Sequence, residues 1–63
     1  MQFTFKIHID TYRDFRDYMV DASMRIGELP DQEERIQGMR ALMDWARDAY
    51  PDWWDRWLRG GHL

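Results

Sequence analysis

The sequence predicts a small α+β domain, in which one N-terminal β-strand precedes two amphipathic α-helices and a short third helix rich in tryptophan. Three observations carry this prediction. Hydrophobic and polar residues alternate over 2–10, hydrophobic residues recur at spacings of three and four over 11–26 and 31–50, and prolines and glycines separate the segments. Because no low-complexity linker divides the chain, we expect residues 1–63 to form a single domain.

The predicted strand places aromatic and β-branched side chains on one face, namely those of Phe3, Phe5, Ile7 and Ile9. A period of two of this kind is typical of a half-buried β-strand. No later segment repeats the pattern, so the strand has no visible partner within the chain. Since an unpaired strand edge attracts another chain, we expect these four residues to pair between two copies of the protein in a homodimer, or with the sheet edge of a target.

The first predicted helix begins after Asp10 or Thr11, either of which can cap it, and runs to about Ile26. Its apolar stripe consists of Tyr12, Phe15, Met19, Ala22 and Ile26. Gly27 is suited to the left-handed conformation that often follows a helix. Pro30 then marks the turn, because proline disfavours helix in the residue before it.

The second predicted helix runs from about Asp31 to Tyr50. Its apolar face is broad and consists of Ile36, Met39, Leu42, Met43, Trp45, Ala46, Ala49 and Tyr50. Pro51 interrupts the pattern, and Asp52 can cap a short final helix that ends near Arg59.

Negative charge gathers at the start of the second predicted helix. The net charge of the chain is −3, and four acidic residues occur within seven positions: Glu28, Asp31, Glu33 and Glu34. A surface of this kind repels phosphate and suits a basic protein partner. The alternative is that these residues favour the helix start through the helix dipole.

The third predicted helix carries Trp53, Trp54 and Trp57. Tryptophan is enriched in binding hot spots, so we expect these residues, together with the four acidic ones, to form the partner-binding surface. The alternative is that the rings fold back to complete a small core. Adjacent residues differ by about 100° around a helix, so Trp53 and Trp54 cannot easily both be buried, and we expect one ring to be available to a partner.

The residues needed for catalysis are missing from the sequence. It contains no cysteine, its two histidines have no zinc-ligand spacing, and no glycine-rich loop follows the strand. Ser23 lies in a predicted helix and outside any nucleophile turn. We therefore expect a protein that is not an enzyme and that needs no cofactor or metal. The absence of a signal peptide or an apolar run of membrane-spanning length predicts a cytoplasmic protein without membrane association.

A strand followed by two helices over residues 2–50 resembles the ribbon-helix-helix family of dimeric DNA-binding regulators. The resemblance is one of architecture. It implies that Thr4, Lys6 and His8, on the polar face of the strand, would read bases in the major groove. The helix start that would receive phosphate is acidic here, and the chain has no basic excess. Nucleic acid is therefore not the partner we expect.

The combination of an unpaired strand, an acidic half and surplus tryptophan indicates a small, acidic, non-enzymatic protein-binding module. An inhibitor, an antitoxin or an adaptor would each act by occupying a protein surface. The composition suits the small inhibitory proteins of bacteriophages and mobile genetic elements. A DNA-binding regulator of the ribbon-helix-helix kind is the alternative, and a purely structural subunit is a third reading.

Overall fold

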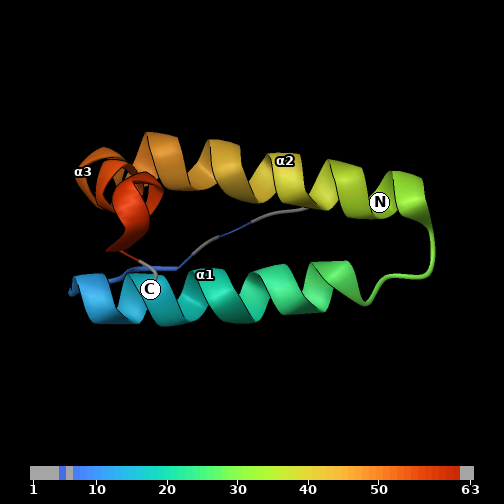
Figure 1. Cartoon of the computed structure of the whole chain (residues 1–63), viewed down its shortest axis with the longest axis horizontal. Coiled ribbons are helices and arrows are strands. Elements are labelled where there is room, and N and C mark those ends of the chain that lie inside the picture. The colour runs from blue at the N-terminus through green and yellow to red at the C-terminus, as the bar shows by residue number, and fades with distance from the viewer. Residues whose placement is uncertain (1–4, 6, 62–63) are drawn as a thin grey trace.

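The computed structural model of the chain describes residue 5 and residues 7–61. In this part of the chain α1 (Tyr12–Gly27) and α2 (Gln32–Ala49) are followed by α3 (Pro51–Arg56) and a final turn over Trp57–Gly61 that is kinked at Gly60. α1 and α2 lie side by side as an antiparallel hairpin, and α3 turns across its open end (Figure 1). The turn between α1 and α2 occupies the opposite end (Figure 1).

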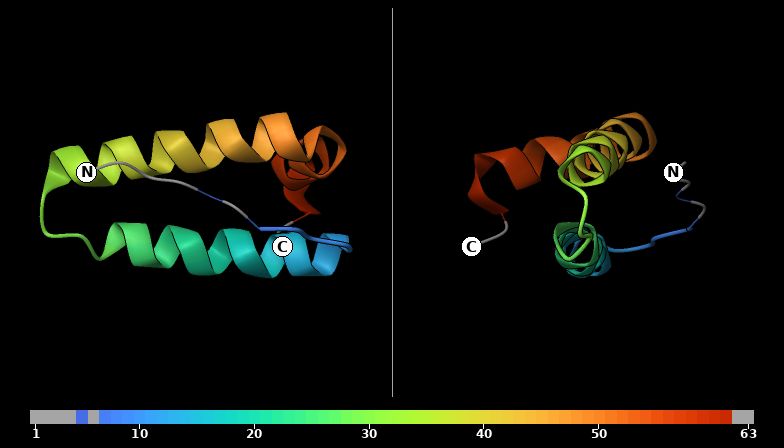
Figure 2. Two further views of the ribbon diagram at one scale, coloured as in Figure 1. Left: turned by 180° about the vertical axis from the view of Figure 1, so that it is seen from behind. Right: turned by 90° about the vertical axis from the view of Figure 1, so that its right-hand side faces the viewer.

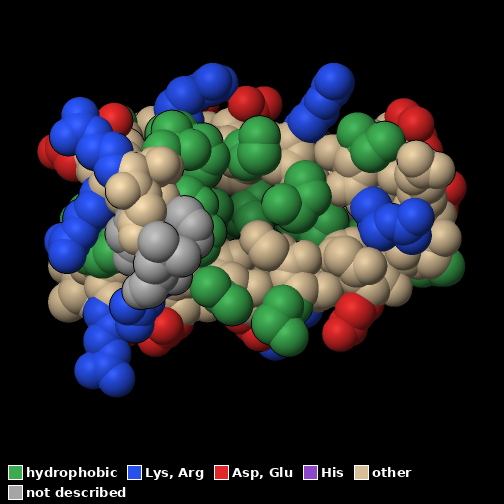
Figure 3. Space-filling model, in the orientation of Figure 1, with side chains coloured by type: hydrophobic (Ala, Val, Ile, Leu, Met, Phe, Trp, Pro, Cys, Tyr) green, Lys and Arg blue, Asp and Glu red, His purple; other side chains and the backbone are tan. Residues whose placement is uncertain are grey.

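The hairpin has two broad faces that are covered differently. The segment 7–11 lies on one of them, here called the N-terminal face, and α3 lies on the other, here called the α3 face (Figure 2). Figure 3 shows the α3 face, where hydrophobic side chains are visible between the two long helices. The helix pair is thus a central layer, with the N-terminal segment on one side and α3 on the other.

The prediction of an α+β fold is wrong. The structure is 80% helical, and the residues that it describes contain no β-strand. Residues 7–10 are extended but have no ladder partner in the described part of the chain. The N-terminal β-strand and its pairing between chains are therefore corrected to a single extended segment that packs on helices.

The Tyr50 side chain, between α2 and α3, and not a second strand, forms hydrogen bonds with the backbone of this extended segment. The backbone N–H of Ile9 donates to the Tyr50 hydroxyl at 2.8 Å, and that hydroxyl donates to the Ile7 carbonyl at 3.4 Å. Ile9 is 5% exposed and belongs to the core, and the Phe5 ring lies 5.6 Å from that of Trp45. Ile7 is 43% exposed, and Phe3 lies outside the described residues. The alternation thus agrees with the burial of Ile9 and the partial burial of Phe5, but not with the exposure of Ile7, and the surface that covers Phe5 and Ile9 is helical.

Replacing Tyr50 by Phe tests this anchor. The change keeps the ring and removes the hydroxyl, so the Ile9 N–H loses its hydrogen-bond acceptor. An unsatisfied donor in a part-buried position costs about 1–2 kcal/mol. We expect the free energy of unfolding, measured by urea titration, to fall by this amount. An unchanged value would mean that water replaces the hydroxyl without cost.

The apolar stripe predicted for the first helix is confirmed in its main part. Phe15, Met19, Ala22 and Ile26 are buried, whereas Tyr12 is half-buried. Of the two candidate caps, Thr11 takes the role, because its hydroxyl accepts the Asp14 N–H at 3.2 Å.

The prediction of a left-handed Gly27 is wrong. Gly27 is the last residue of α1, and Glu28 caps the helix with φ −86°. The one positive φ among the described residues belongs to Gly60, at 95°. Gly27 is helical here because the chain leaves α1 through Glu28 without a left-handed residue.

A Gly27→Ala substitution is therefore expected to stabilise the protein. A Cβ at this position would meet no atom within 4 Å, and alanine restricts the unfolded chain more than glycine does. We expect a gain of about 0.5–1 kcal/mol in the free energy of unfolding, measured as a higher melting temperature. A loss of stability would show that the backbone needs a conformation here that alanine disfavours.

The second predicted helix is confirmed, but its buried face is narrower than the sequence indicates. Leu42 and Ala46 are buried, while Ile36 and Met43 are 44% and 42% exposed. Asp31 caps the helix and accepts the Glu33 N–H at 3.4 Å. The predicted end differs slightly. α2 ends at Ala49, and α3 begins with Pro51 at its first position, so Asp52 lies inside α3 instead of capping it.

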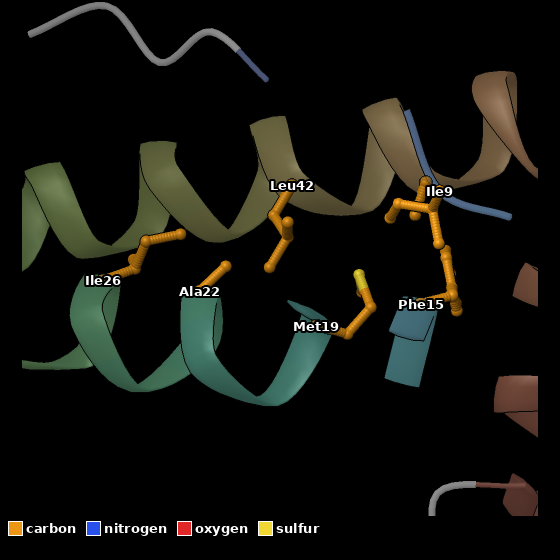
Figure 4. Packing of buried hydrophobic residues seen from close by; sticks show 7 residues of the cluster. Ile9, Phe15, Met19, Ala22, Ile26 and Leu42 are labelled. Carbon is orange, nitrogen blue, oxygen red and sulfur yellow. The ribbon is translucent and has the colours of Figure 1, made fainter. Parts of the chain in front are cut away.

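The core lies between α1 and α2 and extends under α3. Its buried members are Ile9, Phe15, Met19, Ala22, Ile26, Leu42 and Ala46. Their side chains point toward one another from the two helices and from the N-terminal segment (Figure 4). No helix in the described part of the chain has the length and hydrophobicity needed to cross a membrane.

Candidate functional surface

The four acidic residues predicted to bind a partner lie at the turn end of the hairpin. Glu28 and Asp31 cap the two facing helix ends, and Glu33 and Glu34 lie in the first turn of α2. Asp31 accepts a backbone N–H of this turn, and Glu33 accepts from Gln37 at 3.4 Å. For Asp31, Glu33 and Glu34 the arrangement matches the role of acidic residues at a helix start, whereas Glu28 lies at the C-terminal end of α1, where the helix dipole does not favour a negative charge. Binding of a basic partner at this end stays a prediction.

Reversing two of these charges distinguishes the helix-start role from a binding role. Glu33→Lys with Glu34→Lys places positive charge at the positive end of the α2 dipole. We expect a loss of about 0.5 kcal/mol per residue at low ionic strength, reduced by salt. Thermal unfolding at two salt concentrations measures it. No change at low salt would remove the dipole explanation and strengthen the case for a partner-binding role.

The tryptophans lie at the other end of the molecule. α2 has 18 residues, which at about 1.5 Å per residue separates its first turn from α3 by roughly 27 Å. The acidic residues and Trp53, Trp54 and Trp57 thus do not form one continuous surface.

All three tryptophans are half-buried and pack against the core. The Trp53 ring stacks on Tyr50, with centroids 5.0 Å apart and planes inclined by 14°, and its centroid lies 5.8 Å from that of Phe15. For Trp53 this is the arrangement expected if the rings complete the core. None of the three is among the exposed large hydrophobic residues, which in the same segment include Leu58 at 61%.

The residues predicted to read DNA do not form a described site. Thr4 and Lys6 lie outside the described residues. The His8 side chain is 84% exposed, and its Nε2 lies 2.7 Å from a carboxylate oxygen of Asp10. The paired ribbon that would carry these residues into a groove is absent from the described part of the chain.

Contacts of aromatic rings show which flank of each long helix faces which side. The Trp45 ring lies 5.6 Å from Phe5 and 5.3 Å from Tyr18, so this flank belongs to the N-terminal face. On the other side, the Arg56 guanidinium of α3 lies 4.1 Å from the centre of the Tyr12 ring. Tyr12 therefore marks the flank of α1 on the α3 face.

Given these markers and a rotation of about 100° per residue, the charges of α1 and α2 separate by face in part. Arg16 lies on the flank of α1 at the α3 face, and Arg13, Arg40 and Arg47 lie on the outer sides of their helices, inclined toward that face. The opposite flanks carry Asp14, Asp21, Glu34 and Asp48, with Arg25 as the basic exception, whereas Asp17, Glu33 and Asp44 lie on the outer sides near the arginines. Figure 3 shows basic and acidic side chains around the hydrophobic ones on the α3 face. The acidic flanks of α1 and α2 thus lie toward the N-terminal face, while the outer sides carry charges of both signs.

An apolar strip lies beside these arginines. It consists of Ile36, Met39 and Met43, which share the α2 flank on the α3 face and are here called the methionine strip. Met39 packs partly against the core, and the other two are more than two-fifths exposed. Hydrophobic side chains gather along the seam between α1 and α2 beside α3 (Figure 3).

The arginines around the strip differ in how far their charge is neutralised. Arg47 pairs with Asp44 at 3.0 Å, and Arg16 lies 3.8 Å from Asp17. Arg40 is exposed and makes no salt bridge or hydrogen bond within the described part of the chain. Its charge is available to a ligand. Sequence reasoning missed these arginines, because a helical-wheel projection places Arg40 near Asp44 and Arg13 near Asp17 and so does not separate them from the acidic residues.

The N-terminal face has a shallow hollow of about 280 Å³. Its walls include Phe5, Tyr18 and Ala22, and the ion pair between Asp21 and Arg25 lies at its rim. Burial raises the pKa of the Tyr18 hydroxyl, and the charge of Arg25 partly opposes this shift. The volume is below that of most small-molecule sites.

Groups that could perform chemistry are not brought together in the described residues. The described residues contain no cluster of three side chains able to hold a metal ion. Comparison of the chain with protein-family models, with curated proteins and with solved structures gives no match. The surface of the described residues is therefore the feature that bears on function.

Proposed function

We propose that this chain is a small, non-enzymatic protein-binding module that acts in the cytoplasm by occupying the surface of a partner protein, as an inhibitor, an antitoxin or an adaptor does. The observation that carries the proposal is the methionine strip. It leaves two large side chains, Ile36 and Met43, 44% and 42% exposed two turns apart on one helix flank, with the half-buried Met39 between them. Contiguous apolar surface rimmed by polar residues is typical of protein interaction sites.

The flexibility of methionine supports the same function. Its unbranched thioether adapts to varied partners, and methionine-rich surfaces recur where proteins bind other proteins. The α3 end of the strip adds half-buried tryptophans, and aromatic residues are enriched at the centre of interfaces. The alternative of a ribbon-helix-helix regulator has no comparable support, because it requires a strand that the described residues lack.

Site-specific photo-crosslinking tests the proposal. A benzoylphenylalanine at position 43 places the reactive group in the methionine strip, and the same residue at position 24 is the control. Met24 is 62% exposed and turns away from the core on the outer side of α1. We expect one protein species to be captured from cells at position 43 and not at position 24. Equal capture at both positions, or none at position 43, would contradict the proposal.

The homodimer stays a prediction. The unpaired strand that suggested it is not present in the described residues, where Ile9 is buried in the core of its own chain. A crosslink from position 43 to a second copy would identify the partner as the same protein.

A further inference from the structure

We propose that the partner segment bound by the methionine strip is an acidic amphipathic α-helix. It would lie along the seam between α1 and α2 on the α3 face, with its apolar side on Met39 and Met43. Its carboxylates would meet Arg40, Arg47 and the arginines at the α3 end. This inference rests on the proposed function and adds the chemistry of the partner.

The dimensions of the strip suit a helix. Ile36, Met39 and Met43 recur at spacings of three and four, so their side chains form a row along one flank of α2. Seven residues of helix extend about 10 Å, which matches about two turns of a partner helix. Helices bind grooves between helices through apolar residues at positions i, i+3, i+4 and i+7.

Charge decides which helix is favoured. Arg40, exposed and without an ion pair in the described residues, lies beside the strip, and Arg47 lies two turns further along the same flank. Arginine guanidinium groups bind carboxylates with two parallel hydrogen bonds. A basic helix would meet repulsion on this face, so electrostatic complementarity selects an acidic one.

The net charge of −3 does not cancel this preference. Four acidic residues of α1 and α2, Asp14, Asp21, Glu34 and Asp48, turn to the opposite face, and the molecule measures 31 × 23 × 15 Å. At physiological ionic strength the field of a charge decays over about 8 Å. A carboxylate beside the methionine strip therefore experiences mainly Arg40, because Arg47 and Arg59 are paired with Asp44 and Asp55. The overall charge matters more at low salt.

The apolar strip makes a protein helix a better occupant than a nucleic acid. Phosphate contacts require cations but bury little hydrocarbon, and the strip would stay exposed beneath a nucleic acid backbone. An acidic amphipathic helix covers the strip and pairs the arginines in one arrangement. This is the combination that the α3 face offers.

The test uses the full chain labelled with ¹³C at the methionine methyl groups. The probe is a monomeric 18-residue peptide with leucine at i, i+3, i+4 and i+7 and glutamate at the remaining surface positions, and the control peptide has lysine in place of glutamate. We expect the glutamate peptide to shift the Met39 and Met43 signals and to leave Met24 unchanged. The lysine peptide should shift neither.

Two matched charge reversals give the second readout. Arg40→Glu alters the α3 face, and Arg25→Glu makes the same change in net charge on the other face, where Arg25 pairs with Asp21. We expect Arg40→Glu to weaken binding of the glutamate peptide by about tenfold or more, and Arg25→Glu to change it less than twofold. A melting curve for each variant confirms that both are folded at the titration temperature.

Several outcomes would overturn the inference. They are equal binding of the lysine peptide, shifts at Met24 alone, equal effects of the two reversals, and no binding of the glutamate peptide. Shifts of Met39 and Met43 by a 20-base-pair DNA duplex or by phosphatidylserine vesicles, without shifts by the peptide, would assign the face to a different ligand. If position 43 captures a protein in cells while the glutamate peptide fails, the proposed function stands and only the chemistry of the partner is wrong.

Discussion

Replacing Phe15 by Ala is expected to remove most of the chain's stability at 25 °C. Phe15 is 0% exposed, and its ring lies 6.1 Å from Tyr12 and 5.8 Å from both Tyr50 and Trp53. Truncating a buried phenylalanine costs about 3–5 kcal/mol. A chain of 63 residues has a total stability of roughly 3–9 kcal/mol, so one substitution removes most of it.

The measurement is urea unfolding followed by circular dichroism at 222 nm. Phe15→Leu is the matched control, because it keeps an apolar side chain at the same site and is expected to cost less. Val20→Ala, at a residue 44% exposed on the same helix, should change stability by less than about 1 kcal/mol. If Phe15→Ala costs no more than Val20→Ala, Phe15 is not at the centre of the core.

The helices could be predicted from the sequence because a spacing of three and four reports the geometry of one helix. Phe15, Met19 and Ala22 repeat at this spacing and are buried. The acidic cap at position 31 set the start of α2 correctly, whereas the cap predicted at Asp52 placed the start of α3 two residues after Pro51, where the helix begins. These signals are local, so they do not depend on how the helices meet.

The strand prediction was wrong for a reason that is not local. Alternation over residues 2–10 predicts that every second side chain faces an apolar surface. It does not show whether that surface is a sheet or a helix pair. Here the partner of the Ile9 N–H is a side-chain hydroxyl 41 residues further along the chain, and no pattern near Ile9 announces it.

The candidate surface was predictable only in part. The sequence showed that acidic residues, tryptophans and methionines are present, but not their distribution over the two faces. That distribution depends on which flank of α2 receives Trp45, and the contacts of Trp45 with Phe5 and Tyr18 set this flank. Once it is known, Arg40 and Met43 share a face.

Trp53→Ala is expected to detach α3 from the hairpin and to lower the free energy of unfolding by about 3 kcal/mol. The Trp53 ring joins α3 to the core through its stack on Tyr50 and its contact with Phe15. Trp53→Phe keeps an aromatic ring at the site and should lose less. Leu58→Ala, at a residue 61% exposed in the turn that follows α3, is the control for a change that leaves the core intact.

The same substitution is expected to loosen the N-terminal segment, although Trp53 is remote from it in sequence. Tyr50 is held between Trp53, Phe15 and Trp45, and its hydroxyl accepts the Ile9 N–H. Without the stack Tyr50 gains freedom, so the Ile9 amide should exchange with solvent at least about tenfold faster in Trp53→Ala than in Leu58→Ala. Hydrogen exchange measured by NMR below the unfolding transition gives this ratio. Equal rates in the two variants would mean that Phe15 and Trp45, with ring centroids 5.8 and 5.7 Å from that of Tyr50, suffice to hold the anchor in place.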